Sequence, residues 1–101
     1  MSDVYAIVRW IRENRFSRNQ HFDEHATAAG VAARRLHRFL RAIERDVMAA
    51  SLVQVRRSDG GFSVSMEFPE VRLTRVVSLT TEEHALLVED PRIAARLSPD
   101  D

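Results

Sequence analysis

Near residue 50 the apolar residues change their spacing, and this change restricts the fold more than any other feature of the sequence. Over residues 36–47 they recur every three or four positions, the period of a helix with one buried face. Over residues 62–68 apolar and polar residues alternate strictly, the period of a strand with one buried face. A chain with both periods in separate segments is neither all-helical nor all-β, so the sequence predicts an α+β fold.

The N-terminal segment predicts one helix followed by a loop. Apolar residues at three- and four-residue spacing predict the helix over residues 4–14. Tyr5 and Trp10 are interpreted as half-buried packing residues of this helix. Residues 15–22 have no helical period and are rich in Asn, Gln, Ser and Arg, which predicts a loop.

Gly30 is predicted to be a turn between two further helices. Asp23 is a suitable N-cap for a short helix that ends near Ala29. Glycine inside a helix costs about 1 kcal/mol relative to alanine, whereas at a tight turn it adopts a positive φ without strain. A long helix is then predicted over residues 31–49, which completes an N-terminal unit of three helices.

The long helix has two opposite faces when it is wound at about 100° per residue. The apolar face carries Leu36, Phe39, Leu40, Ile43 and Val47. The opposite face carries four basic residues, which we call the arginine ridge: Arg34, Arg38, Arg41 and Arg45. Like charges four residues apart weaken an isolated helix. A bound polyanion would neutralise the ridge and relieve this repulsion, so the ridge favours a polyanion as the partner.

Three strands are predicted after residue 50. Strands over 52–57 and 62–68 flank the turn at residues 58–61, whose Asp-Gly pair is typical of a hairpin. A third, edge-like strand is predicted over residues 71–79.

Two short helices are predicted at the C-terminal end. Thr80 and Glu83 have the spacing of a capping box ahead of a helix through Leu86 and Leu87. Asp90, followed by a proline, is a suitable N-cap for a second helical piece over residues 91–97.

Length and composition predict a single domain without disulfides or thiolate metal sites, because the chain has 101 residues and no cysteine.

The formal net charge is zero, but residues 1–57 hold eleven arginines and six acidic residues, a net charge of +5, and residues 58–101 carry −5. This asymmetry favours a polyanion partner for the first half. The start of the sequence has no signal-peptide pattern and no apolar stretch fit to span a membrane, so a cytoplasmic location is expected.

All fifteen basic residues are arginine. A genome rich in G and C is the simpler explanation of this usage. The chemistry remains relevant in either case, because the guanidinium is a planar fork of donors that suits phosphate and guanine edges.

Residues 26–41 resemble the helix-turn-helix of bacterial transcriptional regulators. The matching positions are Ala26, Gly30, Val31, Leu36 and Phe39. The resemblance implies a small winged helix-turn-helix domain, with the helix-turn-helix at about 23–48, a β-hairpin wing at about 52–68, and a C-terminal strand and helices at 71–97. It also implies binding of double-stranded DNA with the recognition helix in the major groove.

Carried over to this sequence, the resemblance implies two groups of DNA-binding residues. The recognition helix contributes Arg34, Arg35, His37, Arg38 and Arg41, and the wing contributes Arg56 and Arg57. A homodimer is expected, because two-fold pairing doubles the contacts and suits a palindromic site. The third strand and the helices through Leu86, Leu87 and Ile93 are either the dimer surface or the closure of the monomer's core.

Other function classes have weaker support in the sequence. There is no nucleophile motif and no phosphate-binding glycine loop, so catalysis, a cofactor and a small-molecule ligand are not expected. His21 and His25 have a spacing that could suit a metal, but no third ligand lies nearby in the sequence. The main alternative is a protein-interaction module, such as an antitoxin or adaptor, on the same scaffold.

Overall fold

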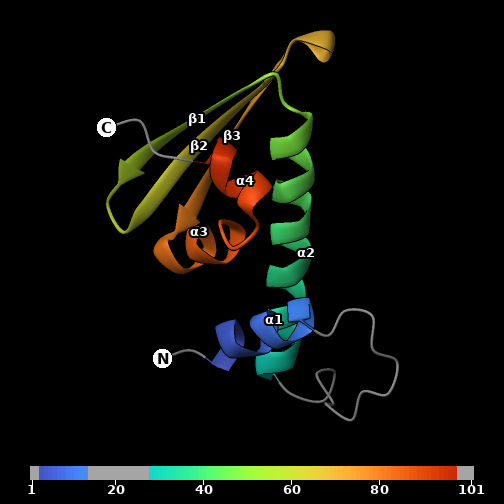
Figure 1. Cartoon of the computed structure of the whole chain (residues 1–101). Coiled ribbons are helices and arrows are strands. Elements are labelled where there is room, and N and C mark those ends of the chain that lie inside the picture. The colour runs from blue at the N-terminus through green and yellow to red at the C-terminus, as the bar shows by residue number, and fades with distance from the viewer. Residues whose placement is uncertain (1–2, 14–27, 98–101) are drawn as a thin grey trace. The chain divides into compact units, whose positions relative to one another are not determined.

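The computed structural model describes residues 3–13 and 28–97 of the chain. In chain order the described elements are α1 (Asp3–Glu13), α2 (Ala28–Ala49), β1 (Leu52–Ser58), β2 (Gly61–Phe68), a 3-10 turn η1 (Pro69–Val71), β3 (Leu73–Thr80), α3 (Thr81–Leu87) and α4 (Pro91–Arg96) (Figure 1). This order confirms the α+β class. The chain divides into two compact units, Met1–Arg41 and Ala42–Asp101.

The first unit contains α1 and the N-terminal part of α2. α1 confirms the helix predicted near the N-terminus, and Val8 on it is fully buried, as are Ala33 and Leu40 on α2. Tyr5 and Trp10 are half-buried, as expected of packing residues. The predicted loop at 15–22 and the predicted N-cap Asp23 lie outside the described residues.

The turn predicted at Gly30 is wrong, because α2 begins at Ala28 and continues through Gly30 without interruption. Among the described residues, Gly60 is the glycine that has a positive φ. Gly30 therefore does not have the positive φ that a tight turn would require. Gly30 is buried, close along α2 to the buried Ala33.

The second unit is built around a three-stranded antiparallel sheet in the order β1-β2-β3. Val55 on β1 lies opposite Val64 on β2, which lies opposite Val77 on β3, so one face of the sheet is apolar across all three strands. The predicted hairpin turn is confirmed, with Gly60 at a φ of 79°. The third strand is confirmed as an edge, but it begins at Leu73, because Pro69–Val71 form η1.

One face of the sheet forms the core of this unit with the C-terminal part of α2, α3 and α4, which Figure 1 shows on one side of the strands. The buried residues contributed by the sheet are Val55, Val64, Met66, Val77 and Leu79. Those contributed by the helices and by the residue that follows α2 are Ile43, Val47, Ala50, Leu86, Leu87 and Ile93. Leu86, Leu87 and Ile93 are therefore buried in the core of this unit.

The ends of α3 and α4 have the caps predicted from the sequence. The Thr80 hydroxyl accepts a hydrogen bond from the Glu83 amide, and the Glu83 carboxylate accepts one from the Thr80 amide at 2.7 Å. The Asp90 carboxylate accepts a bond from the Arg92 amide at the start of α4. Because α3 begins directly after β3, the capping box also fixes where the edge strand ends.

Candidate functional site

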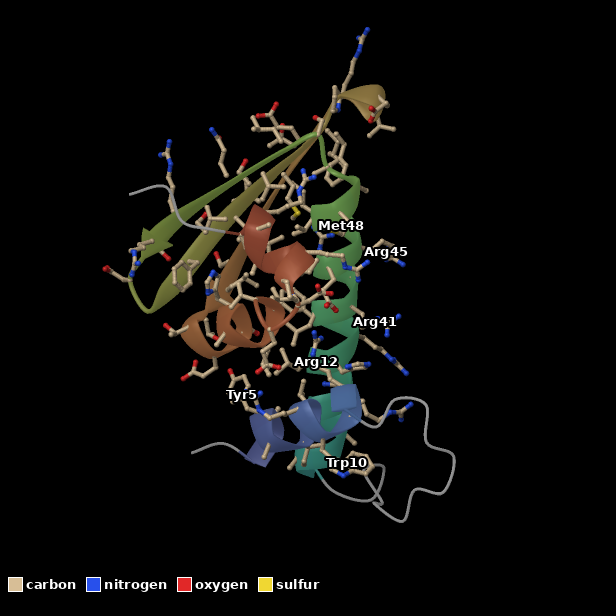
Figure 2. The ribbon with its side chains drawn as sticks, in the orientation of Figure 1. Tyr5, Trp10, Arg12, Arg41, Arg45 and Met48 are labelled. Carbon is tan, nitrogen blue, oxygen red and sulfur yellow. The ribbon has the colours of Figure 1, made fainter. Side chains whose placement is uncertain are left out.

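The arginine ridge lies on a single uninterrupted helix. Arg38, Arg41 and Arg45 are exposed, and Arg34 is half-buried. With a rise of about 1.5 Å per residue, the three exposed arginines span roughly 10 Å of α2. Figure 2 shows the side chain of Arg41 extending away from α2. The continuity of the helix therefore brings three guanidinium groups to one face.

Among the described residues, no acidic side chain forms an ion pair with the exposed arginines of the ridge. Ion pairs join Arg75 to Asp46 and Arg92 to Asp90, and within the described segments no ion pair involves Arg38, Arg41 or Arg45. Asp46 is itself on α2, but its carboxylate accepts the hydrogen bond of Arg75 on β3. Among the described residues, the charges of Arg38, Arg41 and Arg45 are thus not paired.

Two further residues of the predicted recognition helix lie away from the ridge. Arg35 is exposed and lies on the flank of the ridge, about 60° around the helix from Arg38. His37 is half-buried and its Nδ1 atom is buried. The ring of His37 therefore lies at the border of the packed face and does not project with the ridge.

The two arginines predicted for the wing point to opposite faces of the sheet. Arg56 lies opposite Ser63 and belongs to the exposed face, whereas Arg57 lies opposite Phe62 at the edge of the packed face. The guanidinium of Arg57 is 5.8 Å from the centroid of the Phe62 ring, within the range of a cation–π contact. Both side chains are exposed, but a flat surface on either face of the hairpin would meet only one of them.

Phe62 also links the hairpin to α3. Its ring stacks on His84 with the centroids 4.0 Å apart, and His84 Nε2 lies 3.2 Å from the carbonyl oxygen of Leu97. These contacts join the hairpin, α3 and the end of α4. This cluster supports the position of the β1–β2 hairpin.

Comparison with known proteins leaves the family of the chain open. No family model, no curated protein and no solved structure matches it. Among the described residues no three His, Asp or Glu side chains form a group that could hold a metal ion, and His21 and His25 lie outside this part of the chain. No helix in the same part is long and apolar enough to cross a membrane.

Arg45 is the residue that the predicted binding set omitted. It was expected on the ridge but was not included among the DNA contacts, because it lies four residues beyond the resembling segment. In the structure its side chain is exposed, like those of Arg38 and Arg41, and the helical period places it on the same face of α2. Helical periodicity alone contains this signal.

Proposed function

We propose that the protein binds duplex DNA through the exposed part of the arginine ridge. The observation that carries this proposal is the presence of three exposed and unneutralised arginines, Arg38, Arg41 and Arg45, on one face of one helix. An α-helix with its side chains is about 10–12 Å across, and the major groove of B-DNA is about 12 Å wide. α2 is therefore of a size to enter the groove with its guanidinium groups directed at the phosphates that line it.

The proposal does not use a helix-turn-helix. α2 acts as one continuous recognition helix, and its backbone needs no turn at Gly30. Arg56 is not part of this surface, because it lies on the exposed face of the sheet, opposite the face against which the C-terminal part of α2 packs. Each guanidinium can form two parallel hydrogen bonds to a phosphate, which is stronger than one neutral hydrogen bond.

A substitution set tests the proposal directly. The variant Arg38→Gln, Arg41→Gln, Arg45→Gln removes the ridge charges, and glutamine retains high helix propensity. We expect its affinity for a fluorescent random-sequence duplex at 50 mM salt to fall at least about 30-fold, since three phosphate contacts are lost.

A control of equal net charge separates the ridge from the overall charge of the chain. The control variant is Arg9→Gln, Arg72→Gln, Arg92→Gln, whose three parent residues are exposed and lie off the ridge. Its affinity is expected to change less than about 3-fold. Equal losses in the two variants, with both folded by circular dichroism, would contradict the proposal.

We further propose that the protein acts as a homodimeric transcriptional regulator. A lone helix contacts few base pairs, whereas two copies related by a two-fold axis read two half-sites. Selection of bound duplexes from a random pool is expected to enrich an inverted repeat. Enrichment of a single half-site, or of no sequence, would oppose this part of the proposal.

A second candidate function is docking of a protein partner at one end of the sheet. Leu52, Val71 and Leu73 lie at the end where η1 joins β2 to β3, and they are 44%, 69% and 54% exposed. Uncovered apolar side chains gathered at one place are a feature of interaction surfaces. The variant Val71→Ser, Leu73→Ser should leave DNA affinity unchanged if the ridge is the binding site, and should abolish capture of a partner if this end is the functional surface.

A further inference from the structure

β3 is an edge strand without the usual protection against pairing with another strand. Among the described residues it pairs only with β2, so one side of an eight-residue strand is left open. Proteins protect such edges with charged side chains, proline or a bulge. β3 contains one charged residue, Arg75, and that residue is joined to Asp46 of its own chain. The other edge strand, β1, is protected by two charged residues at consecutive positions, Arg56 and Arg57.

An apolar residue lies at the middle of this open edge. Val76 is on the exposed face of the sheet, opposite Ser65 of β2, and 64% of it is accessible. Its neighbours on the same face of β3 are Thr74 and Ser78, which are exposed and uncharged. A β-branched residue between two small polar residues fits a strand-to-strand contact better than a solvated surface.

We propose that β3 pairs with β3 of a second copy of this chain, antiparallel and around a two-fold axis beside Val76. The two three-stranded sheets then form one sheet of six strands, and Val76 meets Val76 of the second copy. In this register Thr74 lies opposite Ser78, and Leu73 lies opposite Leu79. All of these residues are on the unit Ala42–Asp101, so the inference does not depend on DNA binding.

The neighbouring registers are less favourable. In a two-fold antiparallel pair, each residue of β3 lies opposite a residue of the second copy. The faces of the two sheets match only when the two residue numbers are equal or differ by two, four or six. An axis at Arg75 places the exposed Val76 opposite Thr74, so the apolar contact is not made. An axis at Val77 places the exposed Val76 opposite Ser78 and leaves the apolar contact unmade.

The proposed contact is small. Residues 73–79 of each copy give about seven strand pairs and about seven inter-strand hydrogen bonds, since bonded and non-bonded pairs alternate and each bonded pair makes two. An interface of this size belongs to the lower class of biological contacts. The dimer is therefore expected to be weak, so that it forms at about 100 μM in a sedimentation experiment and dissociates on dilution.

The absence of cysteine from the chain permits a direct test of the register. In the variant Val76→Cys the two thiols face each other across the axis, within the roughly 4–7 Å between Cα atoms that a disulfide requires. In Ser78→Cys the equivalent residues are about 13 Å apart along the strand. In Gln54→Cys the thiol is on the same face of the opposite edge. We expect Val76→Cys to form a disulfide dimer at least about 10-fold faster than either control under mild oxidation. Equal rates for the three variants would overturn the inference.

A charge exchange provides a second test that does not rely on oxidation. Val76→Lys places two like charges opposite each other, as does Val76→Glu, so each variant alone should be monomeric by sedimentation at about 100 μM. A mixture of the two should form a heterodimer. Val76 is exposed, so both variants are expected to fold, which circular dichroism checks. A parent chain that is monomeric at 100 μM, or a mixture that stays monomeric, would overturn the inference.

Discussion

The two glycines of the hairpin turn should differ sharply in their tolerance of alanine. Gly60 has a φ of 79°, and an added Cβ would meet nothing within 4 Å. Gly61 opens β2 between Ser58 of β1 and Thr80 of β3. A Cβ at Gly61 would overlap the carbonyl oxygen of Leu79 and would lie 3.0 Å from the Cα of Thr80. Both obstacles are backbone atoms, which cannot rotate away as a side chain can.

The cost at each position follows from these surroundings. At Gly60 the left-handed backbone costs alanine roughly 1–2 kcal/mol, of which about 0.4–1 kcal/mol is offset by the lower entropy of the unfolded chain. A net loss of about 1 kcal/mol is expected. At Gly61 the strands must separate where Thr80 caps α3, and the loss should reach about 3 kcal/mol, the upper range for overpacking. In a domain of this size these losses correspond to roughly 4–8 °C and 12–24 °C in Tm.

Thermal and urea unfolding followed by circular dichroism measure both variants against the parent chain. The two substitutions add the same atoms at adjacent positions, so their effects on the unfolded state nearly cancel in the comparison. Gly60→Asn serves as the control for backbone strain, because asparagine tolerates the left-handed region, and it should be the mildest of the three. A Gly60→Ala variant that is less stable than Gly61→Ala would refute this description of the hairpin.

Two other predictions concern the C-terminal helices. Thr80→Val keeps the shape of the side chain but removes the hydroxyl of the capping box, and it should lower the free energy of unfolding by about 1 kcal/mol in urea titrations, whereas Thr81→Val should change it much less. Hydrogen bonds from the side chain and amide of Arg92 lower the pKa of Asp90 below its ordinary value of 3.8. A lowered carboxyl pKa stabilises the fold above the unfolded-state pKa, and this contribution is lost as the pH falls through the folded-state pKa. Urea titrations of Asp90→Asn against the parent should therefore show a constant difference above about pH 5 that shrinks below pH 4, and a difference independent of pH would oppose this.

The sequence predicts most of the second unit because its signals are local. The Asp-Gly turn, the strict alternation over residues 62–68 and the caps at Thr80 and Asp90 each depend on a segment of at most seven residues. Such signals do not require knowledge of the packing partner. The bounds of β2 and the starts of α3 and α4 agree with the predicted segments to within a residue or so.

The prediction at Gly30 failed for the opposite reason. Whether a glycine begins a turn or is buried within a helix depends on what packs against it, and a single sequence does not contain that information. The low helix propensity of glycine favoured a turn. In the structure Gly30 is instead buried within α2, near the buried Ala33. The helix-turn-helix was inferred from the resemblance and depended on this turn, so the proposed DNA contact now rests on the surface of α2 alone.

The candidate site was only partly predictable. The 100° rule placed Arg38 and Arg41 on one exposed face, and the structure agrees. The half-buried position of His37 was not visible, because it depends on how far the packed face extends around the helix. Arg56 and Arg57 were grouped together, although the two-residue period of a strand already directs consecutive side chains to opposite faces.

The salt dependence of DNA binding tests the central claim most directly. The logarithm of the binding constant falls with the logarithm of salt concentration with a slope of about −0.9 for each phosphate neutralised. The variant Arg38→Gln, Arg41→Gln, Arg45→Gln should therefore have a slope shallower than that of the parent by about 2.7 in fluorescence anisotropy titrations between 50 and 300 mM salt. A slope equal to that of the parent, or a parent chain whose binding does not respond to salt, would contradict the proposal that the arginine ridge holds the DNA backbone.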